Sequence, residues 1–521
     1  MLATLLSTTL VALEGRVIRV EVDVAPGLPG FTIVGLGDAS IREARERVRG
    51  ALRNAGFVHP PRRITVNLAP ADVPKTGPAA DLAIAIGILI GSEQFTARAG
   101  RAALIGEVSL GGEVRAVPGL LPMVAALARR GVRRVIVPAQ GADEAMLVGG
   151  VEVLPVATVG DAVDALRARR RAGPVRPNRV ELAAGRLEGG DTRGPILVDP
   201  PQMPDLAEVR GQAEARRALE VALAGGHGML MIGPPGTGKT MLARTIPGLL
   251  PPLSGEESLA ATIVASVSGE APIRSLMRTP PFRAPHHTSS YAAIVGGGPR
   301  LQPGEVTRAD GGVLFLDELT EFSRDVLEAL RQPLEDGRVT IVRASGAATL
   351  PARFQLIAAT NPCPCGYAGD ETRCTCPQGV PERYVGRISG PLRDRVDIWV
   401  TLSRVQGRAM VASVEPESSA AVAGRIAGAR TIQRARLGGR LNARLSGRAL
   451  RAHAAMTPLT ARRLGDLADS ERLSGRGTER LLRVGRTVAD LAGSWAVEIE
   501  HLEEAARWRP PSNRPLIALA V

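Results

Sequence analysis

A glycine-rich segment at residues 233–240 has the residue types and spacing needed to bind phosphate. It reads Gly-Pro-Pro-Gly-Thr-Gly-Lys-Thr, which is the P-loop pattern of a glycine, four residues and then Gly-Lys-Thr. Backbone N–H groups of such a loop surround phosphates, the lysine contacts the β- and γ-phosphates, and the threonine hydroxyl binds Mg²⁺. We expect a nucleoside triphosphate to be bound by Gly233, Pro234, Pro235, Gly236, Thr237, Gly238, Lys239 and Thr240.

The surrounding sequence favours a P-loop over a plain glycine-rich turn. The preceding run, Met229–Ile232, is apolar and free of charge, as in a buried strand, and the residues after Thr240 can begin a helix whose dipole favours phosphate. Only two of the 65 Lys and Arg residues are lysines, Lys75 and Lys239. Surface charge therefore did not require lysine. A compact ammonium at Lys239 suits a phosphate cradle better than a broad guanidinium does.

Two further polar sites follow apolar runs. Asp317 and Glu318 come directly after Val313–Leu316, and Asn361 follows Phe354–Thr360. Ligands of open α/β sheets bind at the carboxyl ends of the strands, so these side chains are expected beside the P-loop. We expect Asp317 to help bind Mg²⁺, Glu318 to polarise the attacking water, and Asn361 to orient that water. A buried strand that ends in two acids by chance is the alternative.

The order of lysine, acid pair and polar residue on successive strands resembles the AAA+ ATPases. The resemblance implies ATP and Mg²⁺ as ligands and a closed homo-oligomeric ring, expected to be a hexamer. It also implies an arginine finger that reaches a neighbour's γ-phosphate, for which Arg395 is the candidate, and a lid arginine that acts within its own chain, for which Arg480 is the candidate. The chain offers alternatives at both positions, which are Arg387 and Arg393 for the finger and Arg476 and Arg483 for the lid arginine.

Three stretches narrow the resemblance to the magnesium-chelatase-like ComM/YifB proteins. They are Phe-Arg-Ala-Pro-His-His-Thr-Ser-Ser at 282–290, Asn-Pro-Cys-Pro-Cys-Gly at 361–366, and the segment 473–484. The likeness extends over nearly the whole chain. It implies a ring-forming, ATP-driven DNA motor for branch migration or unwinding, acting in recombination and natural transformation. The alternative is a chelatase-type protein remodeller that assists a metal-inserting partner.

The N-terminal region resembles the proteolytic domain of Lon. The similar stretches are 72–81, which contains Lys75-Thr-Gly-Pro-Ala-Ala80, and 106–121. Lon has its nucleophilic serine where this chain has Ala79, and its catalytic lysine falls near Leu121. Because neither position carries a nucleophile or a base, proteolysis is excluded. Lys75 precedes the Gly-Pro and is expected to have a structural or interface role.

All four cysteines lie in one short window, at Cys363, Cys365, Cys374 and Cys376. Four thiols so close in sequence can form a tetrahedral Zn²⁺ site, although the CxC spacing is tighter than the usual CxxC. A disulfide pair is the alternative and is less expected in a cytoplasmic protein. The pair His286-His287 has no acid or cysteine beside it in sequence, so an exposed-loop or structural role is favoured over metal binding.

Residues 337–350 alternate with period two around Ser-Gly, which predicts a β-hairpin before the strand that ends at Asn361. In related AAA+ helicases such a hairpin enters the central channel, and Arg338 and Arg343 are the candidates for contact with DNA phosphates. A solvent-facing hairpin without a partner is the alternative. A second basic run, 425–451, has eight arginines and no acid. Scarce aromatic residues (2%) argue against stacking of single-stranded bases.

The overall charge agrees with an anionic partner. The net charge is +13 and the isoelectric point is near 10.8, which suits nucleic acid, whereas a solvated basic surface without a partner is the alternative. The N-terminus lacks the basic region of a signal peptide, and no apolar run is long enough to cross a membrane. We therefore expect a soluble, cytoplasmic protein.

The elements that must position these residues divide the chain into four parts. The expected organisation is an α/β Lon-like domain at 1–172, a linker at 173–204, an α/β AAA+ core at 205–403 and a helical lid at 404–521. Strand-like runs occur at 16–24, 63–68 and 134–137. Helix-like runs occur at 40–55, 80–90, 120–130 and 161–170.

Overall fold

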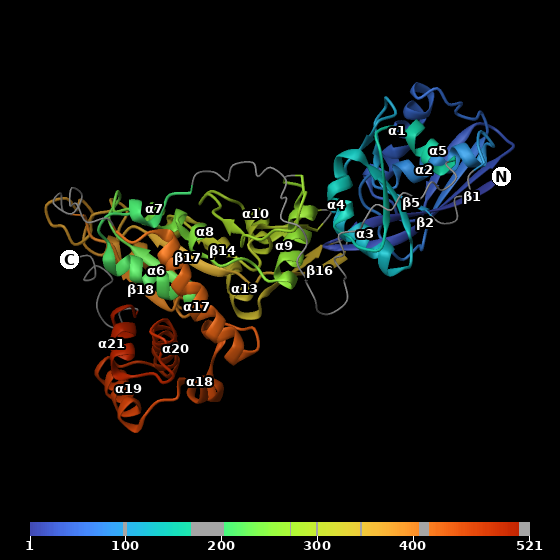
Figure 1. Ribbon diagram of the computed structural model, residues 1–521. Helices are drawn as coiled ribbons and strands as arrows, with labels where there is room; N and C mark the ends of the chain where they lie inside the picture. Colours follow the sequence, from blue (N-terminus) through green and yellow to red (C-terminus); the bar gives the residue numbers. More distant parts are fainter. Residues whose placement is uncertain are drawn as a thin grey trace.

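The computed structural model describes residues 1–96, 102–167, 203–270, 272–298, 301–343, 346–405 and 416–509. The described residues form two α/β parts and a group of C-terminal helices (Figure 1), which confirms the expected α/β fold with helices at the C-terminal end. The predicted linker, 173–204, lies outside the described residues except for its last two.

The N-terminal part is built on a seven-stranded sheet of order β3-β4-β2-β1-β5-β8-β9. The pairs β1/β2 and β2/β4 are antiparallel, whereas the other four pairs are parallel. Its strands are β1 (Leu2–Val11), β2 (Glu14–Ala25), β3 (Gly30–Val34), β4 (Arg63–Ala69), β5 (Ala102–Leu104), β8 (Arg134–Pro138) and β9 (Glu152–Val156), with a small hairpin of β6 (Glu107–Val108) and β7 (Val114–Arg115) beside them.

The helices of this part are α1 (Ala39–Asn54), α2 (Asp81–Gly91), α3 (Leu120–Arg129), α4 (Ala142–Met146) and α5 (Val159–Arg167). Every residue of α2 is buried, because its Ala, Ile and Leu side chains are apolar on all faces and it packs against β1, β2 and α1. The four helices expected from periodicity are confirmed within one or two residues. The last three residues of the run predicted at 161–170 lie outside the described residues.

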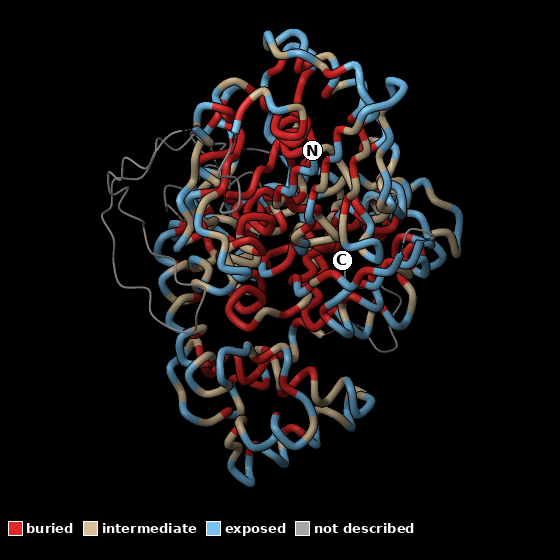
Figure 2. The backbone as a smooth tube through the Cα atoms, turned by 90° about the vertical axis from the view of Figure 1, so that its right-hand side faces the viewer, coloured by how far each residue is buried: buried red, intermediate tan, exposed pale blue. Residues whose placement is uncertain are grey.

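The second part is built on a five-stranded, wholly parallel sheet of order β11-β14-β17-β10-β18. Its strands are β11 (Phe282–Arg283), β14 (Val313–Leu316), β17 (Gln355–Thr360), β10 (Met229–Ile232) and β18 (Ile398–Thr401). All residues of β10, β14 and β17 are buried, as expected for strands of a parallel sheet that is covered on both faces. Figure 2 shows buried backbone gathered in the interior of the molecule, with exposed segments around it.

Short helices and two hairpins surround this sheet. The helices are α6 (Ala213–Gly225), α7 (Lys239–Arg244), α8 (Ile246–Leu249), α9 (Gly255–Ser268), α10 (Tyr291–Val295), α11 (Glu305–Arg308), α12 (Arg324–Ala329), α13 (Arg331–Asp336), α14 (Val380–Val385) and α15 (Gly390–Arg393). The hairpins pair β12 (Gly296–Gly297) with β13 (Gln302–Pro303), and β15 (Arg338–Arg343) with β16 (Gly346–Pro351).

The C-terminal helices are α17 (Ser419–Leu437), α18 (Gly447–Ala454), α19 (Pro458–Ser470), α20 (Gly475–Leu491) and α21 (Ile499–Arg507). α17 runs along the core beside α6 and α8 and continues to the other helices of the group (Figure 1). Its apolar side chains share one buried cluster with α20, α21 and the core sheet. Among the described residues, no helix is both long and apolar enough to cross a membrane.

The N-terminal part contacts the core through α3, α4 and α9 (Figure 1). The backbone N–H of Gly119 donates to the carbonyl of Ser266 at 2.9 Å, and the Ser266 hydroxyl donates to the Glu144 carboxylate at 2.5 Å. Two α9 side chains, Leu259 and Ile263, pack against a buried cluster of the N-terminal part. Burial raises the pKa of Glu144, while hydrogen bonds from Ser266 and from the backbone of Leu121 oppose that rise.

The positions compared with the Lon dyad are apolar and buried. Ala79 and Leu121 are 3% and 2% exposed and belong to one hydrophobic cluster. Lys75 is also fully buried, and its ammonium donates to the backbone carbonyl of Pro70 within the same domain. Of the two roles expected for Lys75, the structure therefore supports the structural one.

Candidate functional site

A cavity of about 400 Å³ opens at the carboxyl end of the core sheet. It brings together the P-loop, the acid pair after β14 and the amide after β17, which lie in three separate segments between residues 235 and 361. Its lining residues are Pro235, Gly236, Thr237, Gly238, Lys239, Thr240, Met241, Asp317, Glu318, Thr360 and Asn361.

The backbone of the P-loop needs glycine at several of its positions. Gly236 and Gly238 have φ of +77° and +91°, a region that other residues enter only with strain. A Cβ on Gly233 would lie 2.4 Å from the carbonyl oxygen of Leu402, so no side chain fits there. The loop thus has the close-turning backbone that a phosphate cradle requires.

Lys239 begins α7 and extends its side chain back across the loop. Its ammonium donates to the carbonyls of Gly233 and Pro234, at 2.5 and 2.9 Å, and to the amide oxygen of Asn361 at 3.1 Å. Burial lowers the pKa of Lys239 to about 8, and the nearby carboxylates of Asp317 and Glu318 limit the decrease. Phosphate oxygens would supply the negative charge that this buried cation lacks.

Thr240 and Asp317 present oxygen ligands to the same point. The Thr240 hydroxyl donates to Asp317 Oδ2 at 2.6 Å, and the backbone N–H of Glu318 donates to Asp317 Oδ1 at 3.0 Å. A hydroxyl and a carboxylate beside a phosphate cradle form the oxygen-rich set that Mg²⁺ prefers. These residues therefore fit ATP and Mg²⁺.

Glu318 contacts a residue that sequence reasoning did not connect with the site. His287 Nδ1 lies 2.9 Å from Glu318 Oε2, and the His286 and His287 rings lie 4.2 Å apart between centroids. The sequence carries no signal for this contact, because it depends on the pairing of β11 with β14 in the sheet and β11 has only two residues. The contact is compatible with the structural role expected for this histidine pair, and it places His287 beside Glu318.

Arg395 lies at the edge of the sheet opposite the P-loop. Its backbone adjoins Gly228, which precedes β10, whereas the P-loop follows the carboxyl end of β10. Four strand residues span about 13 Å between those ends. The guanidinium pairs with Glu335 on α13 and is 37% exposed. Arg395 therefore does not line the cavity of its own chain.

Arg480 lies at the same edge as Arg395. It donates to the backbone carbonyl of Asp394 at 3.0 Å and lies 3.8 Å from the Asp397 carboxylate. The structure thus does not bring Arg480 to its own P-loop, contrary to the expected role within its own chain. The physical reason is that α20 packs against the amino ends of the strands. The sequence of α20 alone does not show against which end of the sheet the helix packs.

The alternative arginines are also not among the residues that line the cavity. Arg476 and Arg483 approach Asp394 and Asp397 at 3.7 and 3.6 Å. Arg393 donates to backbone carbonyls of Val385 and Ile388, and Arg387 donates to that of Thr320. Of these arginines, Arg476 is the most exposed, with 80% of its side chain accessible.

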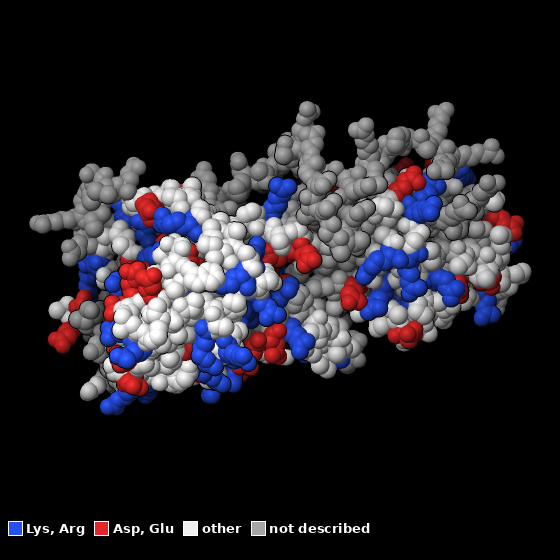
Figure 3. All heavy atoms as spheres, turned by 60° about the horizontal axis from the view of Figure 1, so that its bottom comes forward, with Lys and Arg blue, Asp and Glu red and all other residues white. Residues whose placement is uncertain are grey.

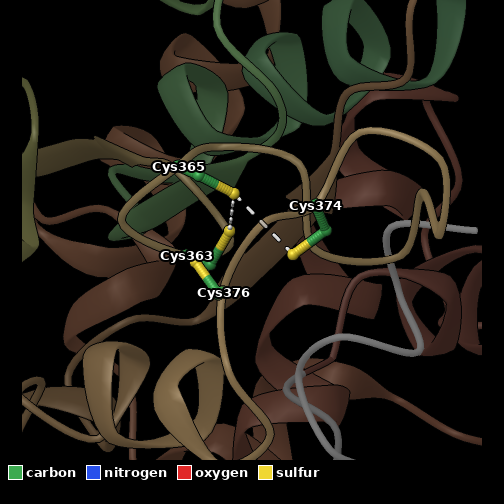
Figure 4. Close-up of side chains that lie close together, drawn as sticks. All are labelled: Cys363, Cys365, Cys374 and Cys376. Carbon is green, nitrogen blue, oxygen red and sulfur yellow. Dashed lines mark hydrogen bonds between the residues drawn. The ribbon is translucent and has the colours of Figure 1, made fainter.

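The four cysteines converge between β17 and α14 (Figure 4). Their sulfur atoms all lie within 4.8 Å of one another, with Cys363–Cys365 at 3.3 Å and Cys365–Cys374 at 3.7 Å. All four are free thiols. Burial and a hydrogen bond with Cys365 raise the pKa of Cys363 to about 12. Burial also acts to raise the pKa of Cys365, but hydrogen bonds from the backbone of Tyr367 and Thr375 outweigh it and lower that pKa to about 6.

The predicted hairpin is confirmed as β15 and β16, with Arg343 opposite Gly346. The turn residues between them lie outside the described residues. Val339 and Ile341 are buried against the core. Arg338 and Arg343 are both exposed, but they lie five residues apart at opposite ends of β15 and on opposite faces, because strand side chains alternate.

Part of the basic run at 425–451 is occupied by contacts within the chain. Arg425 pairs with Glu220 and Glu417, and Arg436 pairs with Asp490. Arg430 donates to the carbonyl of Leu223, and burial lowers the pKa of Arg430 to about 10. The run therefore offers fewer free cations than its sequence suggests.

Comparison with known proteins gives matches along most of the chain. Three family models match, described as "Subunit ChlI of Mg-chelatase" (residues 20–141), "Magnesium chelatase, subunit ChlI" (205–410) and "Magnesium chelatase, subunit ChlI C-terminal" (416–509). The uncharacterized protein YifB of Escherichia coli is 42% identical, with 94% of each chain covered. The competence protein ComM of Haemophilus influenzae is 40% identical, with 98% of this chain and 97% of that protein covered.

A more distant similarity is confined to part of the chain. The Holliday junction branch migration complex subunit RuvB of Saccharopolyspora erythraea is 31% identical over 208 residues. The match covers 36% of this chain and 42% of that protein.

Proposed function

The chain belongs to the magnesium-chelatase-like ComM/YifB family, and on that premise we propose that it is a ring-forming AAA+ ATPase that moves DNA. The observation that carries the ATPase assignment is the single cavity shared by the P-loop, the acid pair and Asn361 on a parallel sheet. The domain limits expected above, with an inactive Lon-like N-terminal domain, an AAA+ core and a helical lid, form part of this proposal.

The proposed hydrolysis divides the work among residues that line the cavity. Lys239 neutralises the β- and γ-phosphates, and Thr240 and Asp317 hold Mg²⁺, which supplies charge stabilisation to the phosphates. Glu318 accepts a proton from the attacking water, and Asn361 orients that water. His287 fixes the Glu318 carboxylate by its 2.9 Å contact.

The proposed ring uses an arginine in trans. Arg395 and Arg480 both lie at the amino ends of the strands, away from the cavity of their own chain. A neighbour that presented its cavity to this edge would receive the partly exposed Arg395 beside its phosphates, where developing charge must be stabilised. Arg395 is therefore proposed to act between subunits of a homo-oligomer, with a hexamer as the expected state, whereas the buried Arg480 is held by Asp394 of its own chain.

The proposed DNA contact uses the β15–β16 hairpin. The partial similarity to a RuvB subunit supports a DNA-associated motor, and so do the net charge of +13 and the exposed arginines of β15. The face in Figure 3 carries clusters of basic side chains separated by acidic ones rather than one continuous basic surface. Such a distribution favours local contacts with phosphates over wrapping of DNA around the whole molecule.

A second candidate function is supported by the family models themselves, which are described as magnesium chelatase subunits. Under it, the same ATP site would drive remodelling of a metal-inserting protein partner. The two candidates share the nucleotide site and differ in the macromolecule that is moved.

The ATPase assignment is tested by separating nucleotide binding from turnover. Lys239→Ala should abolish ATP binding, because it removes the cation that opposes the phosphates. Glu318→Gln should bind ATP as the wild type does but lose turnover by about 10²-fold or more, the usual contribution of a general base. Met241→Leu, at the rim of the same cavity, is the matched control and should preserve both properties. Wild-type turnover by Glu318→Gln would show that another group activates the water.

A further inference from the structure

The four-cysteine cluster has the geometry of a closed metal site. In a tetrahedral Zn²⁺ site with Zn–S bonds of about 2.3 Å, neighbouring sulfurs lie about 3.8 Å apart. Here the Cys363–Cys365 and Cys365–Cys374 sulfurs are 3.3 and 3.7 Å apart, and all four lie within 4.8 Å of one another. A multi-iron cluster would need its ligand sulfurs spread around several metal ions, so this spacing favours one ion.

The segment that carries the cysteines has little other means of holding its shape. No helix or strand occurs between Thr360, which ends β17, and Val380, which begins α14. Structureless segments of this length within a compact domain are uncommon and usually functional. Cys363 and Ala368 are buried, but the tip around Thr372 is exposed. Binding of a metal ion, with release of the thiol protons, would supply the missing stabilisation.

The cysteine segment is joined directly to the nucleotide site at two points. Asn361, two residues before Cys363, accepts a hydrogen bond from Lys239 at 3.1 Å. Gly366, immediately after Cys365, lies so close to the P-loop that a Cβ there would be 2.6 Å from Cδ of Pro235. Gly366 also has φ of +87°, which only glycine adopts readily.

We propose that Cys363, Cys365, Cys374 and Cys376 bind one structural Zn²⁺, and that the ion holds Asn361 and Pro235 in the positions that the nucleotide site needs. The metal site is inferred from the geometry of the four sulfur atoms. The claim that the ion positions Asn361 and Pro235 for nucleotide binding rests on the proposed ATPase function. The site is closed, because four protein ligands complete a tetrahedron, so the ion is structural and not catalytic.

The metal site is tested on the full-length protein purified without chelators. Elemental analysis should give about one zinc per chain, and Co²⁺ exchanged into the wild type should show the thiolate charge-transfer and tetrahedral d–d bands of a Co–S₄ site. The variant Cys365→Ser/Cys374→Ser should lose the metal, whereas Thr375→Ala, an exposed position between two of the proposed ligands, should keep it. Wild-type protein without zinc, with iron in its place, or with Co²⁺ that lacks thiolate bands would overturn the site.

The link to the nucleotide is tested with Gly366→Ala, in which all four thiols remain. This variant should keep one zinc per chain but bind ATP several-fold more weakly, because the added methyl group must displace Pro235. Cys365→Ser/Cys374→Ser should also bind ATP more weakly while Thr375→Ala should not. Unchanged ATP affinity in the metal-free cysteine variant would overturn the positioning role of the ion, and unchanged affinity in Gly366→Ala would overturn the contact with Pro235 as its route. Wild-type protein that contains zinc but binds no ATP would refute the proposed ATPase function and leave the metal site intact.

Discussion

Lys239 has a positive charge at a buried point where its direct partners are neutral oxygens. Two backbone carbonyls and the Asn361 amide accept its three hydrogen bonds, while the carboxylates of Asp317 and Glu318 act on it through space. Burial therefore lowers its pKa to about 8. Bound phosphate therefore stabilises the charged form of this lysine, because it supplies negative charge beside the ammonium and raises its pKa.

ATP affinity should consequently depend on pH. Phosphate favours the charged ammonium, so binding raises the pKa of Lys239 above its ligand-free value of about 8. Below that pH the side chain is charged in both states and affinity should be level. Above it, affinity should fall by up to about tenfold per pH unit, and binding should take up a proton. Calorimetry near pH 9 in buffers of different ionisation enthalpy measures that proton, and ATP affinity that stays constant to about pH 9.5 would contradict the assignment.

Residue types and spacing predicted the lining of the cavity well, because each residue follows an apolar run and parallel strands end at one edge. They did not predict the contact between His287 and Glu318, which depends on the neighbouring position of β11 and β14 in the sheet. The role within its own chain that the AAA+ resemblance implied for Arg480 is not matched by its position beside Asp394. The surroundings of Arg480 depend on how α20 packs. Because the chain has 63 arginines, the residues beside Arg480 in the sequence do not distinguish it from the others.

At the scale of elements, the β15–β16 hairpin separates its two arginines. Arg343 lies at the tip beside the turn, and Arg338 lies at the base, one residue after Gly337. The two side chains leave opposite faces of the strand. A hairpin that inserts its tip between DNA strands would therefore use Arg343 first.

Arg343→Ala should weaken DNA binding irrespective of sequence and reduce the salt dependence of log K by about 0.9, the value of one duplex phosphate contact. Arg338→Ala serves as the matched control and should have the smaller effect. The double variant should still hydrolyse ATP without DNA but fail to move a synthetic Holliday junction, since neither residue lines the nucleotide cavity. Normal junction movement by the double variant would exclude the hairpin as the DNA contact.

Long periodic elements were predictable, and short ones were not. The helices α1, α2 and α3 and the hairpin followed from their apolar periods. Strands of two or three residues, such as β6 and β11, are too short to show a period, so only pairing with neighbours defines them. The cysteine segment was predictable as a thiol cluster, but its contact with Pro235 depends on the folded path of the chain.

At the scale of the molecule, the positions of Arg395 and Arg480 bear on assembly. Both lie at the edge remote from their own cavity, and none of the described residues that line this cavity is an arginine. The contact between the N-terminal part and the core could not be predicted from the sequence either. It joins Glu144 to Ser266, and these residues belong to two separate parts of the chain.

Arg395→Ala should bind ATP normally but lose turnover by 10³-fold or more, the usual contribution of a trans arginine. Mixing it with Lys239→Ala should restore part of the activity, since some interfaces would pair an intact finger with an intact P-loop. The mixture must be shown to contain both variants in one assembly. If such mixed assemblies remain inactive, Arg395 does not act between subunits.

The measurement that tests the central claim most directly is the ATPase rate of the full-length protein without DNA and with single-stranded, duplex and branched DNA at low salt. A DNA motor should bind these DNAs, hydrolyse ATP faster in their presence and move a branched junction only while ATP is consumed. Glu318→Gln should bind the same DNAs without turnover or movement. A wild-type protein that hydrolyses ATP but neither binds DNA nor responds to it would contradict the motor and favour the chelatase-type remodeller.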